Sequence, residues 1–203
     1  LRSVVGKDQL AVVAEFKRRS PSAGLLAASS DPVEVAGRYV AAGAAGMSIL
    51  TEQDHFGGDL CDLLRVREAF AELPLLMKDF VLDPRQVLQG ASAGASAVLL
   101  IARLLDGAQL RELLHVCREQ QVDALLECHH RAELDAALEL PPAGVLLGIN
   151  NRDLDTLVTD RSTAEALLPR VPVDRPVLAE SGYGTPGQIR SLLGLCDGVL
   201  VGT

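Results

Sequence analysis

Charged side chains close several apolar segments of this sequence, and their types could carry acid–base chemistry. Glu15 and Lys17 close the first of these segments two residues apart, so both would lie on one face of an extended strand. Lys78, Glu127 and Glu180 close three later segments. Carboxylates and amines that are brought together away from water acquire shifted pKa values, which general acids and bases require. These side chains are therefore candidates for catalysis if the fold brings them together.

The segments that lead to these residues are short, apolar and regularly spaced. Eight of them start 22 to 36 residues apart, which suits β-loop-α units better than hairpins. Little alternation of polar and apolar residues occurs within them, which indicates parallel strands buried on both faces. The predicted strands are 10–16, 46–51, 73–78, 97–102, 123–128, 145–150, 176–180 and 198–201.

Helical signals occupy the intervals between the predicted strands. Asp31-Pro32, Asp83-Pro84 and Thr185-Pro186 each combine an N-capping side chain with proline at the first helical position. Gly43 and Gly94 stand where a helix should end before the next strand begins. Together these signals predict seven helices, each between two consecutive strands.

Eight strands that alternate with helices predict an α/β fold, a (β/α)8 barrel. We expect a single domain over residues 1–203, because no linker or charge run interrupts the series. A doubly wound open sheet is the alternative. Glu15, Lys78, Glu127 and Glu180 end alternate strands, so in a barrel they should meet near one level of its catalytic face. An ion-pair ring that plugs the barrel mouth is the structural alternative.

Small polar residues and glycines follow the last two predicted strands. Ser181 and Gly182 come after the seventh strand, and Gly202 and Thr203 come after the eighth. Barrels often bind phosphate at these loops through backbone N–H groups. The loop with Ser20-Pro21 could close such a site from the first strand. Tight turns alone would also explain the glycines.

Aromatic residues and histidines near the strand ends have two interpretations each. Phe56 and Phe80 follow the second and third strands, where they could form a wall for an aromatic substrate or pack in the core. His129 and His130 follow Glu127 without further metal ligands at suitable spacing. We therefore expect no metal site there and interpret both histidines as ordinary loop residues.

Composition excludes several classes of function. The formal net charge is −8 and aromatic residues make up only 3% of the chain, which argues against a nucleic-acid partner. Apolar runs reach only about six residues and no signal peptide opens the sequence, so no membrane partner is expected. The four cysteines form no CxxC pair, which is typical of thiols in a reducing cytoplasm.

Several stretches of the chain resemble the indole-3-glycerol phosphate synthase family of tryptophan biosynthesis, and they occur in that family's order. The most specific are AEFKRRSPS at 14–22 and GINNRDL at 148–154. The others are SILT at 48–51 with FGG at 56–58, KDF at 78–80 with DP at 83–84, LE at 126–127, AESG at 179–182 and VG at 201–202. The resemblance implies a barrel of the ribulose-phosphate-binding type. Relative to that family, we expect the N-terminal extension and the final helix to be lacking.

The resemblance implies a carbon–carbon lyase that uses no cofactor and acts on 1-(2-carboxyphenylamino)-1-deoxy-D-ribulose 5-phosphate. The ring carbon that bears the carboxylate attacks the ketone carbon, then carbon dioxide and water leave, and indole-3-glycerol phosphate forms. Lys78 is the expected general acid at the ketone oxygen, with its pKa lowered by burial. Glu127 is the expected base for dehydration. Lys17, paired with Glu15, would be a second acid or would hold anionic groups of the substrate.

The remaining matches imply contacts with the substrate. Asn150 and Glu180 would bond the sugar hydroxyls or orient the lysines, and Phe56 and Phe80 would flank the aromatic ring. The phosphate and nearby groups would be bound by Ser20, Pro21, Arg152, Ser181, Gly182, Gly202 and Thr203.

Alternatives to this function stay open at this point. The partner expected is a small phosphorylated molecule, and fusion or association with neighbouring tryptophan-pathway domains is also considered. A truncated or inactive phosphate-binding barrel is one alternative. Another ribulose-phosphate barrel enzyme is the second, such as the isomerase one step earlier. That isomerase would need a Cys and Asp pair near strands one and four, which this sequence does not offer.

Overall fold

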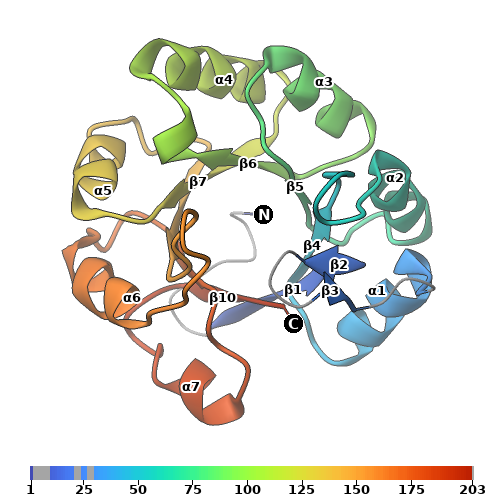
Figure 1. Cartoon of the computed structure of the whole chain (residues 1–203). Helices are drawn as coiled ribbons and strands as arrows, with labels where there is room; N and C mark the ends of the chain where they lie inside the picture. Colours follow the sequence, from blue (N-terminus) through green and yellow to red (C-terminus); the bar gives the residue numbers. More distant parts are fainter. Residues whose placement is uncertain (2–9, 21–23, 27–29, 203) are drawn as a thin grey trace.

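Eight parallel strands close into a barrel in the computed structural model, which describes residues 1, 10–20, 24–26 and 30–202. The strands form a ring and the helices lie outside it (Figure 1). The barrel strands are β1 (Ala11–Phe16), β4 (Gly46–Leu50), β5 (Leu75–Lys78), β6 (Ala97–Ile101), β7 (Asp123–Cys128), β8 (Val145–Asn150), β9 (Val177–Glu180) and β10 (Gly198–Val201). Strand β1 pairs in parallel with both β10 and β4, and this closes the ring. The predicted (β/α)8 barrel is confirmed, and the open sheet is wrong.

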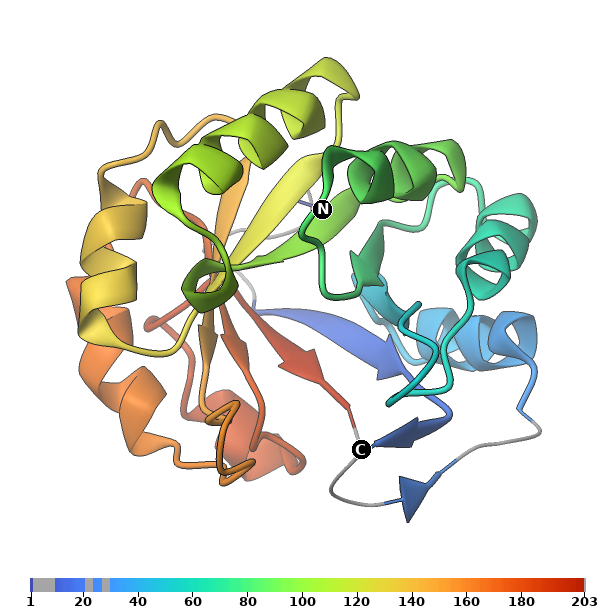
Figure 2. The same cartoon turned by 45° about the horizontal axis from the view of Figure 1, so that its top comes forward.

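Seven α-helices follow the first seven barrel strands in the described part of the chain, as predicted. They are α1 (Pro32–Ala41), α2 (Leu60–Ala69), α3 (Pro84–Ser92), α4 (Gly107–Glu119), α5 (Arg131–Leu138), α6 (Ser162–Leu167) and α7 (Pro186–Arg190). Figure 2 shows them packed around the outside of the strands. A short antiparallel hairpin of β2 (Arg19–Ser20) and β3 (Gly24–Leu25), which was not predicted, lies in the loop after β1.

The helix boundaries follow from the capping residues. The side chain of Asp31 accepts a hydrogen bond from the backbone N–H of Val33 at the start of α1, and Asp83 and Thr185 cap α3 and α7 in the same way. Gly43 and Gly94, with φ of 85° and 89°, turn the chain after α1 and α3. The predicted start and stop signals are therefore confirmed at these helices.

The inside of the barrel is apolar below the level of the charged residues. Because side chains of a strand alternate between its two faces, the residue two positions before each charged strand end points into the same interior. These residues are Val13, Leu76, Leu125 and Leu178, and all four are buried in one cluster within the barrel. They form a floor beneath Glu15, Lys78, Glu127 and Glu180. A second, larger cluster lies between the strands and the helices.

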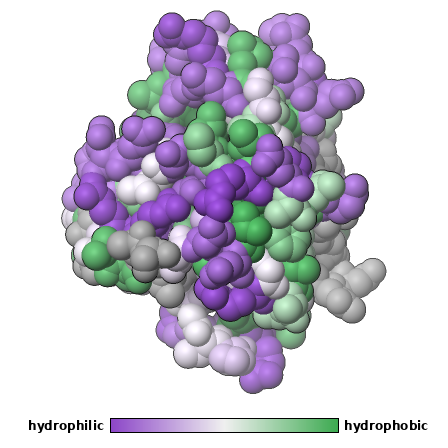
Figure 3. All heavy atoms as spheres, turned by 90° about the vertical axis from the view of Figure 1, so that its right-hand side faces the viewer, coloured by the Kyte–Doolittle hydropathy of each residue, from purple (hydrophilic) through white to green (hydrophobic). Residues whose placement is uncertain are grey.

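One face of the outer surface is largely polar (Figure 3). Hydrophilic side chains dominate the face that carries α1 and α2, and apolar side chains are scattered among them (Figure 3). None of the described helices combines the length and the apolar character that a membrane span requires.

Packing at the start of β10 leaves no room for a side chain at Gly198. A Cβ atom there would lie 2.7 Å from the carbonyl oxygen of Ala11 and 2.7 Å from Cδ2 of Leu178. We expect Gly198→Ala to lower the free energy of unfolding by about 1–3 kcal/mol, because overpacking forces the backbone to move. Urea denaturation followed by circular dichroism measures this loss. Gly187→Ala in α7 is the control, since its Cβ would meet no atom within 4 Å. An equal loss in both variants would contradict the packing explanation.

Candidate active site

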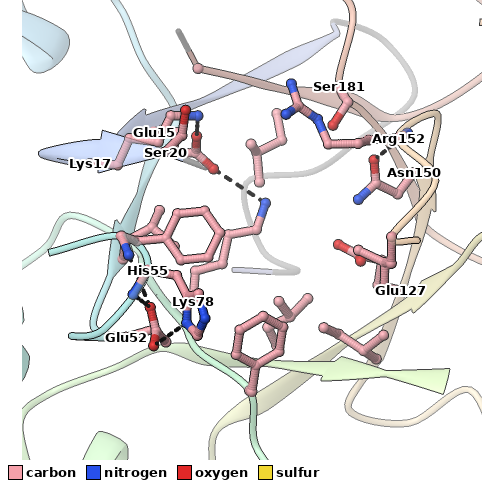
Figure 4. Close-up of a pocket in the computed structure, with 18 of the residues that line it drawn as sticks. Glu15, Lys17, Ser20, Glu52, His55, Lys78, Glu127, Asn150, Arg152 and Ser181 are labelled. Atoms are coloured by element: carbon pink, nitrogen blue, oxygen red, sulfur yellow. Dashed lines mark hydrogen bonds and ion pairs between the residues drawn. The ribbon is translucent and has the colours of Figure 1, made fainter. Parts of the chain in front are cut away.

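A cavity of about 440 Å³ opens at the carboxyl ends of the barrel strands, a volume in the usual range for small-molecule sites. Figure 4 shows its labelled side chains converging from β1, β5, β7 and β8 on one space. Of the residues predicted from the sequence, those that line it are Glu15, Lys17, Ser20, Phe56, Lys78, Phe80, Glu127, Asn150, Arg152, Ser181, Gly182 and Gly202. Glu180 is fully buried and does not line the cavity. Pro21 and Thr203 lie outside the described residues.

Two lysines and two glutamates form a continuous chain of ion pairs at the base of the cavity. The Lys17 Nζ lies 2.6 Å from Oε1 of Glu15, and the Lys78 Nζ lies 3.2 Å from Oε2 of the same carboxylate. Lys78 also lies 3.2 Å from Oε2 of Glu180. The side chains are nearly or fully buried, yet they leave the cavity above them open. They therefore present two ammonium groups to a ligand and do not plug the barrel.

The pKa of Lys78 is shifted in the direction opposite to the one expected from burial. Burial alone lowers the pKa of a lysine, but the negative charges of Glu15 and Glu180 outweigh burial and raise it above its ordinary value. The expectation of a lowered pKa is therefore wrong. Burial raises the pKa of Glu15, but the two lysines outweigh it and the net shift is downward. Lys78 thus meets a ligand as a full positive charge.

Two glycines provide the room for these carboxylates. A Cβ atom at Gly148 would collide with Oε1 of Glu180, and one at Gly202 would collide with Oε1 of Glu15. The carboxylate of Glu15 could not easily move away from a side chain at Gly202, since two lysines hold it. Gly148 leaves the space for Glu180 although it does not line the cavity. The sequence alone did not identify Gly148 as part of the site.

Glu180 has a strongly shifted pKa. Burial raises its pKa to about 8; Lys78 opposes this shift and the nearby Glu127 carboxylate adds to it. The prediction left two roles for this residue, bonding a sugar hydroxyl or orienting a lysine. Its carboxylate forms an ion pair with Lys78 beneath the cavity, which supports the second role.

Glu127 is paired with a histidine that the sequence analysis interpreted as a loop residue. The Nε2 atom of His129 lies 3.2 Å from Oε1 of Glu127, and both side chains are 2% exposed. His129 does lie in the loop between β7 and α5, but its burial and its ion pair were not predicted, and His130 is exposed at the start of α5. Burial lowers the pKa of His129, but the carboxylates of Glu127 and Glu133 outweigh burial and raise it to about 9.

One wall of the cavity is aromatic and apolar. The rings of Phe56 and Phe80 lie with their centroids 6.4 Å apart, and both line the cavity. Glu52 fixes the loop that carries Phe56, because its carboxylate accepts hydrogen bonds from the backbone N–H groups of Asp54, His55 and Phe56. Glu52 itself lines the cavity and was not predicted. A planar aromatic group would fit beside this wall.

The opposite end of the cavity is built from backbone turns. Ser181 and Gly182 follow β9 with φ of 61° and 85°, so two successive residues adopt the left-handed conformation. The side chain of Asn151 holds this turn by donating a hydrogen bond of 2.9 Å to the carbonyl oxygen of Ser181. Asn150 in turn accepts a hydrogen bond from the backbone N–H of Arg152. Turns of this kind direct N–H groups outward and suit an anionic group.

Arg103 is a further cation of the cavity that the sequence analysis missed. It lies in the short 3₁₀ helix Ala102–Leu104 after β6, and its Nη2 donates a 2.8 Å hydrogen bond to Oδ2 of Asp155. The available signal was a cation two residues after a strand end, the same signal that identified the other site residues.

Comparisons with known proteins agree with this geometry. The family model of indole-3-glycerol phosphate synthase matches residues 1–203. Indole-3-glycerol phosphate synthases of Opitutus terrae and Parafrankia sp. are 44% and 45% identical over 198 and 202 residues, which are 95% and 98% of this chain and 74% of each relative. The one of Hyphomonas neptunium is 41% identical over 189 residues, 93% of this chain and 70% of the relative.

Solved structures with much lower identity share the fold. An N-acetylmannosamine-6-phosphate 2-epimerase from Clostridium perfringens matches with a TM-score of 0.71 and 16% identity, over 98% of this chain and 88% of that chain. The carboxyl transferase domain of Rhizobium etli pyruvate carboxylase matches with a TM-score of 0.74 and 12% identity, over 99% of this chain and 41% of that chain. These likenesses concern the barrel alone.

The raised pKa of Glu180 should make stability depend on pH. Between the ordinary pKa of 4.5 and the folded value of about 8, the folded chain keeps a proton that the unfolded chain loses. The free energy of unfolding should therefore fall with rising pH, by at most about 1.4 kcal/mol per pH unit. Glu180→Gln has no such proton, so its stability relative to the wild type should increase from about pH 5 to about pH 8. Urea denaturation across this range measures the difference.

Glu119→Gln is the matched control, because this carboxylate on α4 is 58% exposed. Its stability difference from the wild type should stay within about 0.5 kcal/mol across the range. A Glu180→Gln difference that is equally constant would contradict the raised pKa.

Proposed function

The chain belongs to the indole-3-glycerol phosphate synthase family, and from that premise we propose how its side chains carry out the reaction. The enzyme is a carbon–carbon lyase of tryptophan biosynthesis, and its substrate is 1-(2-carboxyphenylamino)-1-deoxy-D-ribulose 5-phosphate. The observation that carries the proposal is Lys78, held between two carboxylates at the base of an open cavity.

The cavity offers a separate region to each part of the substrate. The aromatic ring would lie beside Phe56 and Phe80, which form the apolar wall. The phosphate would bind at the turn of Ser181 and Gly182, with Arg152 nearby. The sugar chain would then cross the base of the cavity and bring its ketone to Lys78. This arrangement places the reacting carbons between the two fixed ends of the substrate.

Ring closure needs positive charge at the ketone oxygen. As the ring carbon attacks, the ketone oxygen becomes an alkoxide, and the Lys78 ammonium stabilises that charge and donates its proton. An alkoxide is more basic than an amine, so the raised pKa of Lys78 does not prevent this transfer. The carboxylate then leaves as carbon dioxide, and its bonding electrons restore the aromatic ring. The positive charge is supplied by lysines, and we propose neither a metal nor an organic cofactor.

Dehydration needs a base and an acid on the ring-closed intermediate. Glu127 lines the cavity and has a lowered pKa, because its pairing with His129 and the charge of Lys78 outweigh burial. We assign it as the base that accepts the proton. The hydroxyl group leaves as water with a proton from a lysine. Lys17 binds the other oxygen of the Glu15 carboxylate and brings a second ammonium group to the site, as a second acid or as an anchor for substrate anions.

The setting of the enzyme is part of the same proposal. We expect residues 1–203 to act as one barrel domain in a reducing cytoplasm, and the four cysteines, all free, support the reducing setting. Association with neighbouring tryptophan-pathway domains stays a prediction.

Removal of the Lys78 ammonium should abolish turnover with little loss of affinity. We expect Lys78→Met to lower kcat by about 10²–10⁴-fold, the usual contribution of a general acid. Substrate affinity should stay within about tenfold, since the phosphate and ring contacts persist. Indole fluorescence measures turnover. Lys78→Arg is the control, because it keeps the buried charge and the fold but holds its proton more tightly. Near wild-type turnover in Lys78→Met would exclude Lys78 as the acid.

The turn after β9 should govern phosphate affinity. A Cβ atom at Gly182 would lie 2.9 Å from Cγ2 of Thr159 at a φ of 85°, so a side chain there would distort the turn. We expect Gly182→Ala to raise KM by about tenfold or more, with a smaller change in kcat, since it removes binding made before the reaction begins. Inorganic phosphate should inhibit the variant more weakly than the wild type. Gly184→Ala, with no atom within 4 Å of its Cβ, is the control. An unchanged KM in Gly182→Ala would move the phosphate site elsewhere.

A further inference from the structure

His129 lies in the interior between two carboxylates on different elements. Its Nε2 is 3.2 Å from Oε1 of Glu127 at the end of β7. Its Nδ1 is 3.7 Å from Oε2 of Glu133 on α5. The imidazole therefore connects a residue of the cavity with the first turn of a helix. Both are ion-pair contacts, since neither ring nitrogen has hydrogen-bond geometry with a described residue, and a protonated ring supplies the positive charge that they need.

Helix α5 fixes the position of this imidazole. Glu133 is the third residue of the helix, and its Oε2 accepts hydrogen bonds from the backbone N–H groups of His129, at 2.6 Å, and His130, at 3.2 Å. One carboxylate thus holds both the backbone and the charge of His129. These contacts connect the loop after β7 with the first turn of α5.

The imidazolium of His129 supplies a cation to Glu127, the one carboxylate at the base of the cavity that, among the described residues, neither lysine pairs with. Lys17 is paired with Glu15, and Lys78 with Glu15 and Glu180. In the described part of the chain, the cation that forms an ion pair with Glu127 is His129. Without a charged His129, Glu127 would be a buried carboxylate near Glu180 with no cation bound to it. Such a carboxylate takes up a proton, and a protonated Glu127 cannot serve as a base.

The carboxylate of Glu127 meets His129 at the edge of the cavity. Oε1 faces His129, whereas Oε2 is buried and has no hydrogen-bond partner among the described residues. Glu127 lines the cavity, and Figure 4 shows its carboxylate directed into it. The ion pair with His129 is therefore made by a carboxylate that also faces the space where the substrate would lie.

We propose that His129 is a positioning residue that holds Glu127 ionised and in place at the cavity, with Glu133 as the anchor of the imidazolium. This inference rests on the proposed role of Glu127 as the base. His129 does not touch the substrate, since it does not line the cavity. It acts on the reaction through the charge and orientation of Glu127.

The charged groups that face His129 make the pH dependence of the reaction predictable. Glu127 and Glu133 face its two nitrogens, and the exposed His130 ring lies with its centroid 6.4 Å away. Arg103, from the 3₁₀ helix packed against α5, is paired with Asp155. Lys78 and Glu180 act on Glu127 from β5 and β9. Loss of the imidazolium thus leaves Lys78 as the cation that lowers the pKa of Glu127, so that pKa must rise.

The test is the pH profile of kcat/KM for the wild type, His129→Gln and His130→Gln, with indole fluorescence as the readout. A neighbouring opposite charge changes the pKa of a carboxylate by about 1–3. We expect the acidic limb of His129→Gln to move upward by at least about one pH unit. At a pH below this limb, kcat of His129→Gln should be lower than that of the wild type by about tenfold for each pH unit by which the limb moves. Its KM should stay within about threefold of the wild-type value. Higher pH should restore its activity. His130→Gln should retain the wild-type profile.

Glu133→Gln provides a second variant that keeps the helix start intact. Glutamine at this position can still accept the backbone hydrogen bonds of the capping box, but it removes the negative charge beside Nδ1. We expect its acidic limb to move in the same direction as that of His129→Gln, by a smaller amount. Thermal unfolding should show that both variants fold, which separates positioning from loss of structure.

Nitrogen-15 NMR of the imidazole tests the geometry without any turnover. His129 should be protonated on both nitrogens at pH 7 in the wild type, and less so in Glu133→Gln. A neutral His129 at pH 7, or an unchanged acidic limb in folded His129→Gln, would overturn the inference. A wild-type chain without turnover would instead contradict the proposed function, and the NMR measurement would still decide the state of His129.

Discussion

The rest of the site depends on one buried interaction, the ammonium of Lys78 held between the carboxylates of Glu15 and Glu180. Desolvation of these charges is costly, and their mutual attraction offsets that cost only with close contacts. The barrel provides the contacts because β1, β5 and β9 end at the same level, above a floor of apolar side chains. Gly148 and Gly202 then keep the space that the carboxylates need. The strand register and the two glycines together therefore hold a positive charge at a fixed position in the site.

The alternation of side chains along a strand explains why the floor and the charged layer cannot be separated. A shift of one residue in any strand would turn its charged end out of the barrel and its leucine away from the interior. One strand register therefore places both members of each pair. These pairs are Leu76 and Lys78, Leu125 and Glu127, and Leu178 and Glu180. Packing of the apolar floor fixes the strand register, and the register decides which charged side chains meet inside the barrel.

Most of the fold and much of the site could be predicted from the sequence because both depend on local patterns. Apolar runs and capping residues indicated strand and helix positions that hold to within about two residues, and charged strand ends identified the cavity side chains. The misses depend on contacts through space. The pKa of Lys78 follows from charges on two distant strands, the burial of Glu180 from the room at Gly148, and the ion pair of His129 with Glu133 from a glutamate on the next helix. None of these three features can be recognised within a short stretch of sequence.

Two neighbouring carboxylates of the site are driven to opposite protonation states by their surroundings. Burial raises the pKa of Glu180 to about 8, whereas the pairing of Glu127 with His129 helps to hold its pKa below the ordinary value. Such a division marks which carboxylate can accept a proton and which stays neutral near pH 7. A chain with a net charge of −8 still lines this cavity with Lys17, Lys78, Arg103 and Arg152, so four cations can meet a substrate that carries a carboxylate and a phosphate.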